Sequence, residues 1–149
     1  MKQKLITLFA VLALMLPLTA CAPTTTLQLI QVAVNGFVAA EQADHGGSWT
    51  YAQLTTDTDA LATNWSKDTT QQKVTATNLV ITDIKNTPFC DTKCKTYVPI
   101  AVAGIDAAII ILQPSGALTM QTEKDRVATA YANYKIKWNA VAPKKAKLK

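Results

Sequence analysis

The sequence is poor in the residues that build catalytic and metal sites. Its 149 residues include one histidine, three cysteines and five glycines, and only 17% of them are charged. A single imidazole is too few for an ordinary zinc site, and the chain has neither a glycine-rich phosphate loop nor a Gly-x-Ser-x-Gly nucleophile elbow. The hydrophobic share of 49% is that of a small globular protein. We therefore predict no catalytic residue, no metal and no cofactor, which favours a protein that is not an enzyme.

The first twenty residues have the organisation of an export signal. Lys2 and Lys4 give a positively charged start, and residues 5–16 form an apolar run too short to span a bilayer comfortably. We expect residues 1–20 to be removed. About 129 residues then remain, enough for one domain with a sizeable core.

A cysteine follows this signal at the position that decides its type. The segment Leu-Thr-Ala-Cys, ending at Cys21, has an apolar residue, two small residues and a cysteine. It resembles the lipobox of bacterial lipoprotein precursors, and the resemblance covers only the signal and residue 22. It implies cleavage before Cys21 and acylation of that residue by chains such as palmitate, because several acyl chains hold a protein on a membrane durably. An ordinary secretory signal that ends near a cysteine is the alternative.

The residue after the cysteine bears on localisation. Ala22 stands where an Asp would be expected in an inner-membrane form of the enterobacterial lipoproteins that this segment resembles. The resemblance therefore implies the periplasmic face of the outer membrane. Nucleic acid is not an expected partner in that compartment, despite a sequence pI near 9.2.

Three parts are predicted after the signal. Residues 21–26 form the lipidated cysteine and an extended Pro/Thr tether, residues 27–142 a helical domain, and residues 143–149 a disordered basic tail. We expect the tail either to contact an anionic envelope surface or to serve only solubility. Its basic residues are Lys144, Lys145, Lys147 and Lys149.

Apolar residues recur at helical spacing in the first half of the domain. Residues 27–38 predict a helix that ends at His45 and two glycines, although residues 27–34 also alternate like a strand before an Asn35-Gly36 hairpin signal. A second apolar stripe loses phase after Trp65, which predicts a break near residues 66–68. Its members are Tyr51, Leu54, Thr58, Leu61 and Trp65.

A third segment follows that break. Ser66 is expected to cap a new helix with Asp68 in its first turn. Residues 74–84 fit either this helix or a strand, because β-branched residues weaken helix propensity. Pro88 ends the segment in both cases.

Residues 98–112 are almost entirely apolar. A helix of this length measures about 22 Å, less than the roughly 30 Å hydrocarbon core of a bilayer. We predict a central helix packed on most sides, with membrane insertion or the lining of an oligomer as alternatives. Asp106 must face water or find a partner, and a hydrogen-bonded position at the rim of the core is expected.

The last segment has the clearest helical pattern. After a turn at residues 113–116, apolar residues form one stripe up to Pro143, and aromatic residues at this spacing usually belong to a core. The stripe consists of Met120, Val127, Tyr131, Tyr134, Trp138 and Val141. Together the segments predict an all-α fold, a small antiparallel bundle of four to five helices.

Cys90 and Cys94 are the remaining cysteines. In an exported chain we predict a disulfide between them, with only a modest gain in stability because the loop is short. Redox exchange and copper binding are the alternatives. The spacing is superficially similar to the copper site of Sco-type assembly proteins, but Lys95 replaces their proline and His45 is the only histidine available.

Acidic residues supply the remaining candidates. Glu41, Asp44 and His45 offer metal ligands from one helix end, although His45 is well explained by the helix dipole. Asp57 and Asp59 suggest paired carboxylates of a glycosidase, a role that depends on their environment. A pocket that gathers Glu41, Asp57, Asp59 or Glu123 would favour an enzyme.

The prediction for function follows from the anchor and the missing catalytic motifs. We expect a membrane-anchored periplasmic lipoprotein that acts as a binding or structural module of the envelope, held by acyl chains on Cys21 and with a possible envelope protein partner. A cell-envelope enzyme acting on peptidoglycan or lipid is one alternative. A phage- or plasmid-type exclusion or lysis lipoprotein is the other.

Overall fold

The computed structural model describes residues 22–113 and 122–149. Over these residues the fold is all-α, as the sequence predicted, and contains no strand. The signal segment, the lipobox with Cys21, most of the 113–116 turn and Met120 lie outside the described residues. The elements are α2 (Thr26–His45), α3 (Ala52–Asn64), α4 (Thr70–Lys85), α5 (Thr92–Leu112), α6 (Glu123–Val141) and the short 3-10 helix η1 (Lys144–Ala146).

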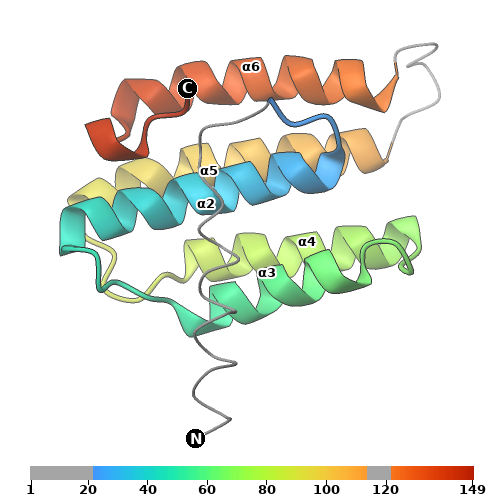
Figure 1. The fold of residues 1–149 in the computed structure, drawn as a ribbon. Helices are drawn as coiled ribbons and strands as arrows, with labels where there is room; N and C mark the ends of the chain where they lie inside the picture. Colours follow the sequence, from blue (N-terminus) through green and yellow to red (C-terminus); the bar gives the residue numbers. More distant parts are fainter. Residues whose placement is uncertain (1–21, 114–121) are drawn as a thin grey trace, which may run out of the picture.

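The helices form three layers (Figure 1). α6 is one outer layer, α2 and α5 lie side by side in the middle, and α3 and α4 form the other outer layer. Successive helices run in alternate directions, which gives the antiparallel bundle that the short connections imply. α5 packs against α2, α4 and α6, so it occupies the centre of the bundle.

α2 shows why residues 27–34 are helical and not a strand. Thr25 caps the helix, and its side chain and that of Gln28 bond reciprocally to each other's backbone N–H groups in a capping box. Gly46 ends the helix with a left-handed φ of 82°. Gly36 therefore lies inside the helix and forms no hairpin turn. The largest buried side chains of α2 include Leu29, Ile30, Val34 and Phe37.

The outer layer of α3 and α4 confirms the predicted stripe and the break after Trp65. Leu54, Thr58 and Leu61 are buried against α4. Residues 74–84 lie within α4, so the strand alternative for them is wrong.

The predicted cap of α4 is also wrong. Thr69, not Ser66, accepts a hydrogen bond from the backbone of Gln72, and the Gln72 side chain bonds back to Thr69. Ser66 lacks a Glu or Gln three positions later, so it cannot form this reciprocal pair. Asp68 accordingly precedes the helix and is not part of its first turn.

α5 begins earlier than the apolar run from residue 98. Asp91 caps it by accepting a hydrogen bond from the Cys94 backbone N–H at 2.9 Å. The helix is central and packs against α2, α4 and α6, as predicted, although only 39% of its most apolar window is buried. By length and composition alone it could cross a membrane. Asp106 is exposed and makes no hydrogen bond within the described residues, which corrects the expected position at the rim of the core.

The C-terminal segment is ordered against the bundle, contrary to the prediction of a disordered tail. Ala146 and Leu148 are buried, because residues 143–149 fold back over α2. The Trp138 indole N–H donates to the Ala146 carbonyl at 3.0 Å. Asn139 bonds both the N–H and the carbonyl of Leu148 at 2.8 Å.

The tether is also packed on the domain. Pro23 is buried, and Thr26 donates its backbone N–H and its hydroxyl to the Glu123 carboxylate at the start of α6. An extended, free tether would leave these groups in water. Thr26 thus lies beside the N-terminal end of α6.

Candidate functional site

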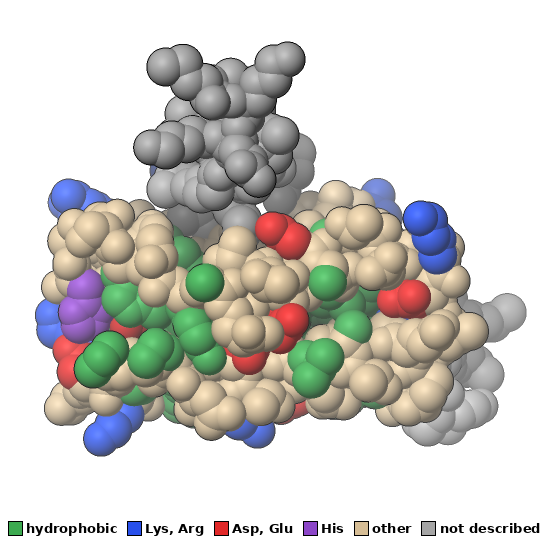
Figure 2. All heavy atoms as spheres, turned by 90° about the horizontal axis from the view of Figure 1, so that it is seen from below, with side chains coloured by type: hydrophobic (Ala, Val, Ile, Leu, Met, Phe, Trp, Pro, Cys, Tyr) green, Lys and Arg blue, Asp and Glu red, His purple; other side chains and the backbone are tan. Residues whose placement is uncertain are grey.

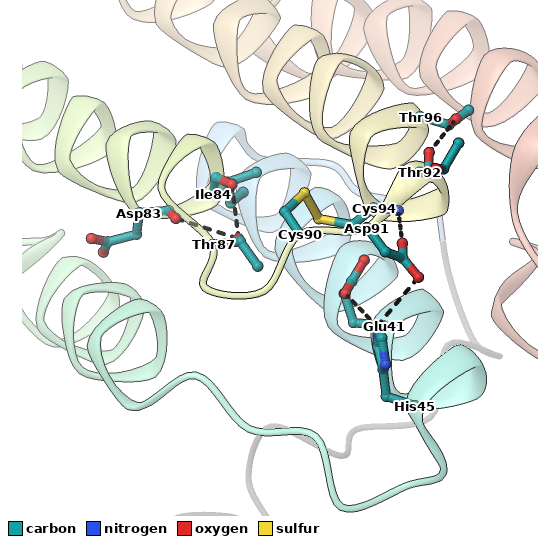
Figure 3. The surroundings of a disulfide bond; sticks show 10 residues. All are labelled: Glu41, His45, Asp83, Ile84, Thr87, Cys90, Asp91, Thr92, Cys94 and Thr96. Atoms are coloured by element: carbon teal, nitrogen blue, oxygen red, sulfur yellow. Dashed lines mark hydrogen bonds and ion pairs between the residues drawn. A yellow bond between two sulfur atoms is a disulfide. The ribbon is translucent and has the colours of Figure 1, made fainter.

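One end of the bundle brings together several of the candidate residues. The end of α2, the loop before α5 and the first turn of α5 carry a buried Glu41, His45, Asp91 and the two cysteines (Figure 3). The Nε2 atom of His45 lies 3.5 Å from Oε2 of Glu41 and 4.0 Å from Oδ2 of Asp91. Neither Glu41 oxygen has a hydrogen-bond partner among the described residues. Burial raises the pKa of Glu41, and the nearby His45 offsets this only in part.

Asp44 turns away from this group. Its carboxylate accepts hydrogen bonds from the Tyr97 hydroxyl at 2.7 Å and from the Lys93 ammonium at 3.0 Å. Although desolvation raises the pKa of Asp44, these two bonds hold it below its usual value. Glu41, Asp44 and His45 therefore do not converge. Among residues 22–113 and 122–149, no three His, Cys, Asp or Glu side chains are placed to hold a metal ion.

The structure places Cys90 and Cys94 together. Their sulfur atoms are 1.95 Å apart and their Cα atoms 5.1 Å apart, which is disulfide-bonding distance. Cys94, in the first turn of α5, is fully buried. Phe89, the residue before this loop, is 96% exposed and has a φ of 58°.

The paired carboxylates are not the predicted ones. Asp57 of α3 lies beside Asp83 of α4, whereas Asp59 is exposed on the other side of its helix. Desolvation, followed by the hydrogen bond and charge of Asp57, raises the pKa of Asp83 to about 6. Asp83 was missed, although it stands three residues after the buried Val80 on the apolar face of α4.

The carboxylates that would indicate an enzyme are dispersed. Glu123 of α6 is bound to Thr26 at the start of α2. Glu41 lies fifteen residues after Thr26, about 22 Å further along α2. Asp57 and Asp59 belong to the opposite outer layer. The hydrogen bonds from Thr26 lower the pKa of Glu123, so this carboxylate serves to join α2 to α6.

Charge is divided between the layers. Residues 122–149, which we call the basic layer, contain two acidic residues against eight basic ones: Lys124, Arg126, Lys135, Lys137, Lys144, Lys145, Lys147 and Lys149. Residues 22–113 contain eight acidic and five basic residues. Figure 2 shows the face opposite the basic layer, where carboxylates lie across the middle and cations near the edges.

Comparisons with protein-family models, with curated proteins and with solved structures give no match.

Proposed function

We propose that the protein is a lipid-anchored binding module of the bacterial envelope, held by acyl chains on Cys21 with its basic layer against an anionic membrane surface. The observation that supports this most directly is the segregation of charge, with eight cations against two carboxylates in residues 122–149. Each Lys near an anionic membrane contributes about 1 kcal/mol of attraction at low salt.

The position of the anchor is consistent with this orientation. Because Thr26 is bound to Glu123 and Pro23 is buried, the segment that follows Cys21 is held on the domain, with Thr26 beside the start of α6. Acyl chains attached five residues earlier would hold α6 close to the headgroups. The folded C-terminal segment supports the same orientation, since Ala146 and Leu148 point inward while the four lysines around them are exposed.

Acylation is tested by metabolic labelling with an alkyne analogue of palmitate. The full chain should be labelled, and Cys21→Ser should remove the label. A double Cys90→Ser, Cys94→Ser variant is the matched control and should keep it. A label that survives Cys21→Ser would contradict the anchor.

Orientation is tested on the acylated full chain reconstituted in vesicles. A membrane-impermeant amine reagent should modify Lys144 and Lys147 several-fold more slowly on vesicles with anionic lipid than on zwitterionic ones, and high salt should remove the difference. Lys67 and Lys85 are exposed on the opposite layer and serve as internal controls. Equal modification of all four lysines on both vesicle types would refute the proposed orientation.

A further inference from the structure

A groove of about 360 Å³ runs between α5 and α6. Its floor is the open face of α5, where apolar residues recur at steps of three and four: Ile100, Ala103, Ala107 and Ile110. Its other edge is polar and comes from α6: Arg126, Thr129, Asn133 and Lys137. The volume falls within the range of small-molecule sites in proteins.

This groove explains the incomplete burial of α5. Ile110 is 64% exposed although it belongs to the most apolar helix of the described chain. Leaving such a face in water costs about 25 cal/mol per Å² of apolar surface. An apolar occupant would recover that free energy.

The dimensions of the groove indicate what kind of occupant fits. From Arg126 to Lys137 it follows eleven residues of α6, about 16 Å of helix axis. Its apolar floor extends over that length, and α6 supplies polar atoms and two cations along one edge. A single hydrocarbon chain with an anionic group at one end matches this pattern.

The charges of α6 distinguish the two ends of the groove. Arg126 forms no ion pair within the described residues, and its Nε and Nη1 atoms are buried without a hydrogen-bond partner there. The first turn of α6 also carries Glu123 and Asp125, however, and Arg126 lies close enough to Glu123 to lower the pKa of that carboxyl, so negative charge offsets the cation at this end. Lys137 is exposed, forms no ion pair within the described residues, and precedes the lysines of the C-terminal segment. An anionic group is therefore attracted to the Lys137 end, where the Asn133 amide offers a hydrogen-bond donor.

We propose that the α5–α6 groove binds one acyl chain of an anionic amphiphile, with its carboxylate or phosphate at Lys137. The inference deepens the proposed function, because a module held on a membrane has such amphiphiles at hand. It does not depend on the orientation of the basic layer, which the amine-modification experiment measures separately.

The acylated full chain, reconstituted in phosphatidylcholine vesicles, is exposed to palmitic acid carrying a photoreactive diazirine in its chain. Mass spectrometry should locate the cross-links on residues of the groove in α5 and α6. Ala103→Trp places a large side chain on the exposed floor and should reduce cross-linking by about tenfold, since several methylenes lose their contacts. Ala132→Trp, on α6 but outside the groove, is the matched control and should leave cross-linking unchanged.

The headgroup is tested by the less disruptive variant Lys137→Gln. It should lower cross-linking of the acid several-fold, while Lys124→Gln should not. The methyl ester of the same probe should cross-link weakly and respond to neither change. Thermal melting by circular dichroism checks that each variant is folded. Cross-links scattered over the surface, or unaffected by Ala103→Trp in a folded variant, would overturn the groove assignment, and equal labelling by acid and ester would overturn the anionic headgroup.

Discussion

The ring of Tyr134 on α6 lies against Gly104 on α5, in the space that a side chain at position 104 would occupy. A Cβ atom there would be 2.8 Å from Cδ2 of Tyr134, closer than real contacts allow. The hydroxyl end of the same ring lies over Gly36 of α2, where a Cβ would be 3.0 Å from the oxygen. Two glycines thus let one tyrosine pack between α2 and α5.

We expect Gly104→Ala to lower the free energy of unfolding by about 1–3 kcal/mol, because the tyrosine or the helix must shift. Urea unfolding measures this. In a double-mutant cycle, Gly104→Ala should cost less free energy of unfolding in a Tyr134→Leu background than in the parent chain. Additive effects of the two substitutions would contradict the direct contact.

Asp83 should make stability depend on pH. Its pKa in the folded chain is raised to about 6 from 3.8, so the protonated carboxyl favours the fold. This stabilisation is complete below about pH 4 and is lost as the pH rises through 6. Asp83→Asn should therefore stabilise the chain by about 1–2 kcal/mol at pH 7.5 and change little at pH 4. Urea unfolding at both values tests this, with the exposed Asp106→Asn as control, and a uniform effect across pH would refute it.

Cys90 and Cys94 should form a disulfide bond in the exported protein. Alkylation without reductant should leave Cys90 and Cys94 unmodified, whereas reduction should expose both. Replacing both by Ala should cost no more than about 2 kcal/mol, because so short a loop restricts the unfolded chain little. Ready alkylation of both residues without reductant would rule out the disulfide and favour the metal or redox alternatives.

Phe89 occupies a left-handed backbone conformation at a position where its ring is exposed. A glycine there avoids the Cβ strain, which costs about 1–2 kcal/mol for other residues. We expect Phe89→Gly to raise the free energy of unfolding by about 1 kcal/mol. Phe89→Ala removes the ring but keeps the Cβ, so it should have no such effect. Equal stabilisation by the two substitutions would show that the gain comes from removing the exposed ring and not from relieving the backbone.

Asn139 should hold the C-terminal segment. Asn139→Ala removes both hydrogen bonds to the Leu148 backbone, at a local cost of about 1–2 kcal/mol. Trypsin should then cleave after Lys144 and Lys145 about tenfold faster. Asn133→Ala, on the same helix but without contact to the segment, should cleave like the parent chain. Unchanged cleavage of Asn139→Ala would show that burial of Ala146 and Leu148 suffices.

The all-α fold could be predicted because helical spacing of apolar residues records which face each helix buries. Leu54, Thr58 and Leu61 show this on α3, and Val127, Tyr134 and Trp138 show it on α6. The pairing of Cys90 with Cys94 was equally accessible, since four residues of chain keep the two sulfurs within reach of each other. The start of α4 was also accessible from the sequence, because Thr69 and Gln72 form a capping box three residues after Ser66, but the prediction chose Ser66.

Only the tertiary structure decided the contacts between helices and segments. Asp57 and Asp83 meet because α3 packs on α4, and no local pattern joins two residues that far apart. The tail is ordered because Trp138 and Asn139 satisfy its backbone, although its composition alone is that of a solvated segment. The groove exists because α6 covers only part of the apolar face of α5. The periodicity of apolar residues shows which face of a helix must be buried. Because the hydrophobic effect has no direction, this pattern does not say which partner covers the face or how much of it stays open. Both depend on the packing of the whole bundle.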